Sequence, residues 1–388
     1  MLQAFFNGLS GLFSFSKGLD NVSNNVSNMN TPGYRGSDTF YRSVNGQGGE
    51  GIGAKVAGTE VRVKPGEARQ TGNSMNAAVD GNGYFVLRDE NGNFFYTRAG
   101  QFQVDKDGYL VDSVSQRRVA GMSASGKLQD LNINPFRTLP PKPTTRVEMV
   151  GALARSGPTD STHKISSVQV YDSAGNRHAL TVEFKPQQVP LNSWEVSISD
   201  DQGVVQTGSI SFGVDGTPVA GFNTITVLMR NSGQQVVLDF GTPGSFNLAS
   251  QVASAPSHTL SAKVVDGSAT ASLSSFSFDE KGTIQFAYAN GEKRAGSQLA
   301  LASFSDETAL IADSSMYRTP PTMRPDYGMA GEGHFGRVRG GYLELSNVDL
   351  SQEFGDILII QRGYQASSRV MTVSNELLEQ LYNGTRGG

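Results

Sequence analysis

The sequence predicts a mainly β, multi-domain protein whose N- and C-terminal α-helices form a coiled-coil-like terminal domain, with an inserted outer β domain. Three observations predict this fold class. Apolar residues recur every seven positions near both ends of the chain. Between the ends, apolar and polar residues alternate around glycine-containing turns. Finally, 46 of the 388 residues are glycine and only 37% are hydrophobic, which suits a turn-rich β protein better than a helical one.

Residues 1–30 are expected to form an amphipathic helix. Two apolar rows of seven-residue spacing run through them, at Phe5, Leu12, Leu19 and Val26 and at Phe15, Val22 and Met29. Because Gly8, Gly11 and Gly18 lower helix propensity, we expect this segment to be loosely ordered alone and helical when partners cover it. The side chains predicted to drive assembly are Leu2, Phe5, Leu9, Leu12, Leu19, Val22 and Val26.

Residues 350–388 repeat the pattern, which predicts a second helix. N-cap candidates lie at Ser346 to Asp349, and Asn383-Gly384 is a helix-termination signal. The assembly residues predicted here are Leu350, Phe354, Ile357, Tyr364, Met371 and Leu378. The two ends together are therefore predicted to be assembly devices, forming one terminal domain from residues 1–30 and 350–388.

The middle of the chain is predicted to consist of β-hairpins. Turn sequences at 89–92, 105–108, 172–176 and 279–282 lie between alternating segments, and Trp194 marks a further strand. A proline-rich joint at 135–143 precedes a Ser/Thr/Val-rich block. We interpret residues 146–270 as the inserted outer domain, and residues 76–145 and 271–325 as the β domain that carries it.

Residues 31–75 and 326–349 are predicted to connect the helices to the β domain. Gly36 to Gly58 contains seven glycines, which is typical of a compliant connector. A disordered surface loop is the alternative.

Composition excludes several function classes. The net charge is −4 with no basic cluster, so a nucleic-acid partner is not expected. No apolar run reaches the length of a membrane span. Without cysteine the chain has neither disulfides nor thiolate sites, and its N-terminus shows no cleavable signal pattern.

No catalytic, metal or cofactor site is predicted. Gly331, Gly333 and Gly336 fit G-x-G-x-x-G, but no helix signal follows, and Asp105-x-Asp107-Gly108 is better explained by a hairpin turn than by a calcium loop. The four histidines, at 163, 178, 258 and 334, are far apart in no metal-binding spacing. His178 is expected to face solvent in a hairpin.

Three separated motifs resemble those of the axial rod and hook proteins of the bacterial flagellum. The first spans residues 24–34, the second lies within 81–111, and the third comprises 346–353 with 361–366. The residues that carry the resemblance are Asn24, Asn25, Asn28, Thr31, Pro32, Gly33, Tyr34, Gly83, Phe85, Arg98, Gly100, Phe102, Asn347, Val348, Asp349, Gln361, Arg362, Tyr364 and Gln365.

The resemblance implies a structural subunit, not an enzyme, that polymerises into a tube around an export channel. The inserted block favours the hook branch, a universal joint between rod and filament. Implied partners are further copies of the chain, the distal rod protein, the hook cap, the hook-filament junction protein and the flagellar type III export apparatus. Export without a cleaved signal would place the chain in the extracellular flagellum.

Polar residues of the terminal helices are predicted to face the channel, foremost Asn21 and Gln365, with Asn24, Asn25, Asn28 and Gln361. A distal rod protein is the nearest alternative. A secreted β-rich polysaccharide hydrolase or an adhesin would also fit the composition, although neither explains seven-spaced rows at both ends.

Overall fold

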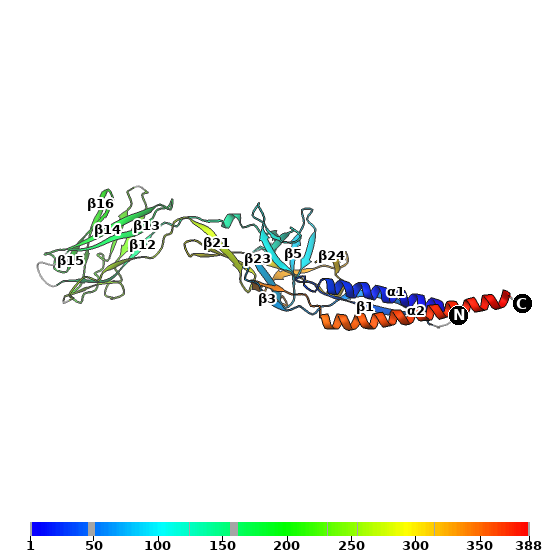
Figure 1. Cartoon of the computed structure of the whole chain (residues 1–388). Coiled ribbons are helices and arrows are strands. Elements are labelled where there is room, and N and C mark those ends of the chain that lie inside the picture. The colour runs from blue at the N-terminus through cyan, green and yellow to red at the C-terminus, as the bar shows by residue number, and fades with distance from the viewer. Residues whose placement is uncertain are drawn as a thin grey trace. The chain divides into compact units, whose positions relative to one another are not determined.

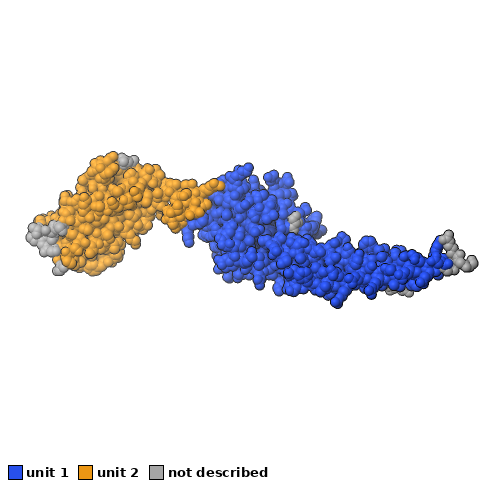
Figure 2. Space-filling view, in the orientation of Figure 1, with its two compact units in different colours: residues 1–136, 275–287, 293–388 blue, residues 137–274, 288–292 orange. Residues whose placement is uncertain are grey.

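A computed structural model describes residues 2–45, 51–123, 125–155, 162–230, 232–253, 255–313 and 315–386. The chain divides into two compact units (Figure 2). Each unit has its own β structure (Figure 1). Unit 1 comprises residues 1–136, 275–287 and 293–388, and unit 2 comprises residues 137–274 and 288–292.

Both predicted terminal helices are confirmed. Helix α1 spans Leu2–Ser27 and helix α2 spans Leu350–Arg386, and the two run side by side in unit 1 (Figure 1). They are antiparallel, because Gly8 lies against Met371 whereas Gly18 lies against Ile360. Asp349 caps α2 by accepting a hydrogen bond from the Ser351 amide at 2.8 Å.

Glycines of α1 form the contact with α2. A Cβ added to Gly8 would lie 3.0 Å from the backbone oxygen of Ser367, and one added to Gly11 would lie 2.5 Å from the Ser367 Oγ. Their low helix propensity alone would weaken α1 as an isolated helix. The structure shows the compensating gain, since a missing Cβ allows the two backbones to approach closely.

A long antiparallel ribbon lies along α1. It consists of β1 (Ser37–Asn45) and β2 (Gly51–Val61), and Ser14 of α1 donates a hydrogen bond to the Ala54 carbonyl at 2.9 Å. The alternative of a disordered loop was wrong for the described part of residues 36–58, whereas the role of a compliant connector stays a prediction. Glycine content suggested flexibility, but ladder pairing and contact with α1 impose strand structure; residues 46–50 lie outside the described part.

The rest of unit 1 is an antiparallel β core. Its central path runs in the order β21-β22-β23-β5-β9-β8-β7-β4-β27, and Tyr84, Tyr96 and Phe304 pack in one of its buried clusters. The hairpins predicted at 89–92, 105–108 and 279–282 are confirmed as β5–β6, β7–β8 and β21–β22. The strands are β3 (Ala68–Gln70), β4 (Asn76–Asp80), β5 (Tyr84–Arg88), β6 (Phe94–Thr97), β7 (Gly100–Val104), β8 (Leu110–Asp112), β9 (Arg118–Met122), β10 (Leu128–Asp130), β21 (Ala271–Phe278), β22 (Thr283–Tyr288), β23 (Lys293–Ser303), β24 (Ile311–Asp313), β25 (Met316–Arg318), β26 (Asp326–Met329), β27 (Arg337–Gly340) and β28 (Tyr342–Glu344). Two short 3₁₀ turns, η1 (Asn134–Phe136) and η2 (Glu307–Ala309), complete the unit.

Unit 2 contains two sheets that share one hydrophobic core. One sheet runs β17-β18-β12-β19 with β20 paired to β12, and the other runs β13-β14-β15-β16. Trp194 is fully buried in the core, and its indole donates a hydrogen bond to Gln251 at 2.9 Å. The hairpin predicted at 172–176 is confirmed as β13–β14. The strands are β11 (Thr138–Leu139), β12 (Arg146–Ala154), β13 (His163–Tyr171), β14 (Arg177–Pro186), β15 (Ser193–Asp200), β16 (Gly203–Ser211), β17 (Thr224–Leu228), β18 (Gln235–Asp239), β19 (Ala249–Val252) and β20 (Ser261–Val264).

Two histidine predictions for unit 2 are corrected. The rings of His163 and His258 lie 4.9 Å apart, because β13 packs against the segment that leads into β20, where the Leu260 carbonyl lies 2.7 Å from His163 Nε2. The ring of His178 lies against the hairpin turn, with Nε2 3.1 Å from Asp172. Hydrogen bonds from His178 and Asn176 lower the pKa of the Asp172 carboxyl to about 2.

Replacing Gly8 by leucine tests the close helix contact. We expect Gly8→Leu to lower the free energy of unfolding by about 1–3 kcal/mol, because the backbone of α2 leaves no room for the side chain. The matched control is Gly355→Leu in α2, where a Cβ would meet open space; it should raise stability by about 0.5–1 kcal/mol through helix propensity. Urea unfolding followed by far-UV circular dichroism measures both, and equal effects would contradict the contact.

Candidate functional site

A polar cluster joins the two helices to the ribbon, and we call it the clasp. It contains Asn25 of α1, Tyr34 and Arg62 at the base of the ribbon, Asn347 before α2, and Glu353 in the first turn of α2. Three of the five, Asn25, Tyr34 and Asn347, were singled out from the sequence by the family resemblance. The fold thus brings motif residues from the two ends of the chain into one site.

Glu353 is the centre of the clasp. Its carboxylate is fully buried and accepts hydrogen bonds from Arg62 at 2.6 Å and from Asn25 at 3.1 Å. Arg62 also pairs with Asp38 of β1 at 2.8 Å. Although burial opposes the charge, the hydrogen bonds to Asp38 and Glu353 raise the pKa of the Arg62 guanidinium. Burial, with the Glu353 charge adding to it, raises the pKa of the Tyr34 phenol.

The two asparagines act as backbone partners for the ribbon. Asn25 accepts from the Ser37 amide at 3.0 Å and donates to the Ser37 carbonyl at 2.9 Å. Asn347 accepts from the Gly36 amide at 2.8 Å and donates to the Lys64 carbonyl at 2.7 Å. An amide side chain carries its acceptor and its donors on two separate atoms, so each asparagine satisfies an N–H group and a C=O group at once.

A second buried group, the charge cluster, lies where the ribbon base meets the β core. It contains Arg35, Tyr84, Arg98, Glu307 and Glu344. Arg35 pairs with Glu307 at 2.9 Å, and Arg98 lies 3.6 Å from Glu344. Burial lowers the pKa of the Arg98 guanidinium and raises that of the Tyr84 phenol. The cluster therefore joins segments from both halves of the chain through charges removed from water.

The glycine of the first motif fits tightly against the second motif. Gly33 has φ +68°, and its amide donates to the Glu344 carbonyl at 2.8 Å. A Cβ there would overlap the backbone amide of Ala99. Gly33 is thus required both by its conformation and by the close packing.

The predicted assembly residues lie on and around the helix contact. In α1, Val22 is buried and Phe5, Leu9, Leu12, Leu19 and Val26 are half-buried. In α2, Ile357, Met371 and Leu378 are half-buried, whereas Leu350, Phe354 and Tyr364 are exposed. The side chain of Leu2 lies outside the described part. The predicted apolar row of α2 therefore runs along the edge of the contact with α1 and not through its centre.

The inner row of α2 escaped the sequence analysis. It consists of Glu353, Ile360, Ser367 and Ser374, again seven apart, and Glu353, Ile360 and Ser374 are buried. Three of the four side chains are polar, so a search for apolar periodicity passed over them. Glu353 ends the third motif, at 346–353, so the family resemblance was an available signal for this position.

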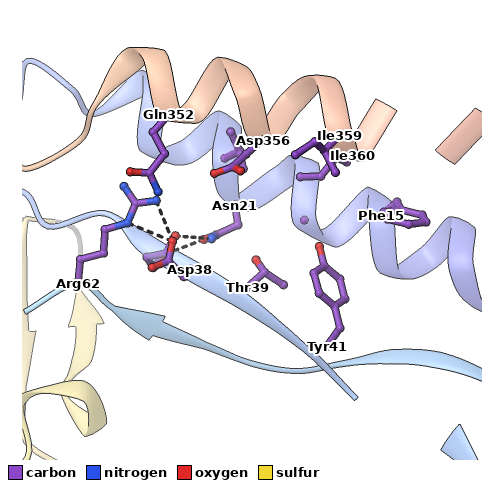
Figure 3. A pocket seen from close by; sticks show the side chains of 13 residues that line it. Phe15, Asn21, Asp38, Thr39, Tyr41, Arg62, Gln352, Asp356, Ile359 and Ile360 are labelled. Atoms are coloured by element: carbon purple, nitrogen blue, oxygen red, sulfur yellow. Dashed lines mark hydrogen bonds and ion pairs between the residues drawn. The ribbon is translucent and has the colours of Figure 1, made fainter. Parts of the chain in front are cut away.

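Part of the predicted channel-facing set is corrected. Asn25 is fully buried in the clasp. The amide of Asn21 points to β1, where it donates to the Ser37 carbonyl and accepts from the Ser37 hydroxyl, each at 2.6 Å (Figure 3). Asn24, Gln361 and Gln365 are exposed, and Asn28 is half-buried.

A pocket of about 390 Å³ lies beside the clasp, between α1, α2 and β1 (Figure 3). Tyr41 points across it toward Ile360, and Asp356 lies above. A Cβ on Gly18 would overlap the Tyr41 hydroxyl, so the ring depends on that glycine. Burial and the Asp356 charge raise the pKa of the Tyr41 phenol.

Neither a metal site nor a membrane-spanning helix is found among the described residues. No group of three or more His, Asp or Glu side chains there could hold a metal ion. Likewise, neither described helix combines the length and apolar character needed to cross a membrane.

Four family models match the chain. The model described as flagella basal body rod protein matches residues 6–35, and the flagellar hook protein FlgE/F/G D1 domain matches residues 78–135. The flagellar basal body protein FlaE D2 domain matches residues 142–296, and the flagellar basal body rod FlgEFG protein C-terminal model matches residues 339–383.

Curated relatives match over their full length. The flagellar hook protein FlgE of Escherichia coli K12 is 29% identical over 98% of this chain and 100% of the relative. The FlgE proteins of Borreliella burgdorferi and Salmonella typhimurium LT2 are 28% and 29% identical, each over 98% of this chain and over 99% and 100% of the relative. The crystal structure of Helicobacter pylori flagellar hook protein FlgE2 covers 71% of this chain and 100% of its own, with 13% identity and a TM-score of 0.46.

Neutralising Glu353 tests the clasp. We expect Glu353→Gln to lower the free energy of unfolding by about 1.5–3 kcal/mol, because Arg62 loses a charged partner in a buried site. The matched control is the exposed Glu379→Gln on the same helix, which should change stability by less than about 0.5 kcal/mol. Urea unfolding measures both, and a Glu353→Gln variant as stable as the control would contradict the role of the clasp.

Proposed function

This chain belongs to the flagellar hook protein family, and on that premise we propose that its paired terminal helices are the device by which copies of it build a tube. The chain is a structural subunit of the flagellar hook. As a member of the flagellum it forms a polymer together with other flagellar components.

The observation that carries the proposal is the character of the helix surfaces. α1 and α2 pack through a narrow, glycine-lined contact, which leaves large apolar side chains facing outward. Phe6 and Phe13 are 56% and 66% exposed, and Val373 is 53% exposed. An apolar surface of this kind is typical of a protein interaction site. Neighbouring subunits would remove it from water.

The clasp is proposed to transmit force between the helix pair and the β core. Glu353 and Asn25 belong to the helices, whereas Arg62 and Ser37 belong to the ribbon. Charged hydrogen bonds in a buried site are the stronger kind in proteins. A mechanical load on the helices would therefore be passed to the ribbon without separating the ribbon from the helices.

Specific partners and the route of export also remain proposals. We infer contacts with the distal rod protein, the hook cap and the hook-filament junction protein, and export by the flagellar type III apparatus without a cleaved signal. Gln361 and Gln365, both exposed on α2, are proposed to line the export channel. We propose no catalytic activity for the chain.

Removing the terminal helices tests the assembly role. A chain of residues 28–349 should form no tubes under conditions in which the full chain polymerises, because both outward apolar surfaces are gone. Negative-stain electron microscopy gives the result, and circular dichroism checks that β structure persists. Tubes of normal length from the truncated chain would refute the proposal.

Unit 2 is proposed to adjust curvature through exchangeable polar contacts. Lys142 and Ser268 are paired by a β-bridge, so a short Gly-Ser linker between them can replace the intervening residues. We expect this variant to form tubes whose curvature differs from that of the full chain, because contacts made by unit 2 are lost. Electron microscopy measures the shape. Tubes with unchanged curvature would argue against a role for unit 2.

A further inference from the structure

Helix α2 carries a second apolar seam on a face that α1 does not cover. Ala366, Val370, Val373 and Leu377 follow one another at spacings of four, three and four residues, the pattern of a coiled-coil seam. The valines and Leu377 are 44–53% exposed. The first seam, through Ile360, Ser367 and Ser374, already faces α1. This seam is therefore available for contact with a second helix.

An apolar groove of about 570 Å³ lies between α1 and the ribbon. Phe6, Leu9 and Phe13 form one wall, and Val44, Ala54 and Lys55 of the ribbon form the other. At about 100° per residue these α1 side chains project away from the Gly8 and Gly11 face that contacts α2. The chain's own α2 thus lies on the opposite side of α1 and cannot fill the groove.

Groove and seam match in spacing. Phe6 and Phe13 are seven residues apart, as are Val370 and Leu377, and seven residues rise about 10.5 Å in a helix. Each aromatic ring can therefore insert between successive side chains of the seam, as knobs enter holes.

Charge restricts which end of the seam can lie near the groove wall. Lys55 is the charged side chain on that wall. The charged row beside the seam consists of Arg362, Arg369 and Glu376, so only its Glu376 end, next to Leu377, offers the ammonium a carboxylate. A carboxylate beside the seam would meet the ammonium at the edge of the groove.

We propose that the second seam of α2 in one copy docks into the groove between α1 and the ribbon of another copy. This rests on the proposed function and names the faces that meet. Each α1 would then lie between two α2 helices, one from its own chain and one from a neighbour.

Engineered cysteines test the pairing directly, because the chain has no cysteine of its own. Phe13→Cys is combined in turn with Val370→Cys, Val373→Cys and Leu377→Cys. At least one pair should give disulfide-linked multimers in oxidised tubes, seen on non-reducing gels. The matched control pairs Phe13→Cys with Phe354→Cys, which is exposed on another face of α2.

Tubes that form without cross-links, or with equal cross-linking in the control, would overturn the docking and leave the proposed assembly role intact. Absence of tubes from the unmodified chain would instead count against the assembly role itself, so the two failures are distinguishable.

A charge swap gives a second test that needs no cysteine. Lys55→Glu and Glu376→Lys should each raise the protein concentration required for tubes by about twofold or more at low salt. The double variant should return it toward that of the unmodified chain, because the ion pair is restored in reverse. A double variant no better than the worse single one would overturn the pairing.

Discussion

The buried carboxylate of Glu353 is the contact on which the other terminal elements depend. It holds Arg62 of the ribbon and Asn25 of α1 at the start of α2. Charges removed from water are costly unless partners satisfy them, so this geometry is favourable only when all three segments are in place. That arrangement fixes the end of α1, the start of α2 and the base of the ribbon relative to one another, and the pocket lies beside it.

Much of the fold was predictable because local sequence patterns determine it. Apolar residues at seven-residue spacing predicted both helices. Alternation of apolar and polar residues around Asp- and Gly-containing turns predicted the hairpins at 89–92, 105–108, 172–176 and 279–282. These signals require only the neighbours of each residue in sequence. The motif residues Asn25 and Asn347 could be named from the resemblance, although their use as backbone partners could not.

The rest depended on contacts between distant residues. Gly8 and Gly11 lower the stability of an isolated helix. They favour the fold only because Ser367 and Met371 of α2 pack closely against them. Glu353 and Ser374 face the partner helix although they are polar, so apolar periodicity missed them. The ribbon was missed because glycine content predicts chain freedom, whereas ladder pairing and Ser14 remove it.

The antiparallel arrangement of the first and last helices has a consequence for quality control. The clasp needs Asn25, near the start of the chain, and Asn347 and Glu353, which ribosomes add only near the end. A product that stops early lacks the acid, the capping aspartate and the whole of α2. A complete subunit is thereby the only product of translation that can close the clasp, because an interrupted one leaves Asn25 and Arg62 without their buried acid.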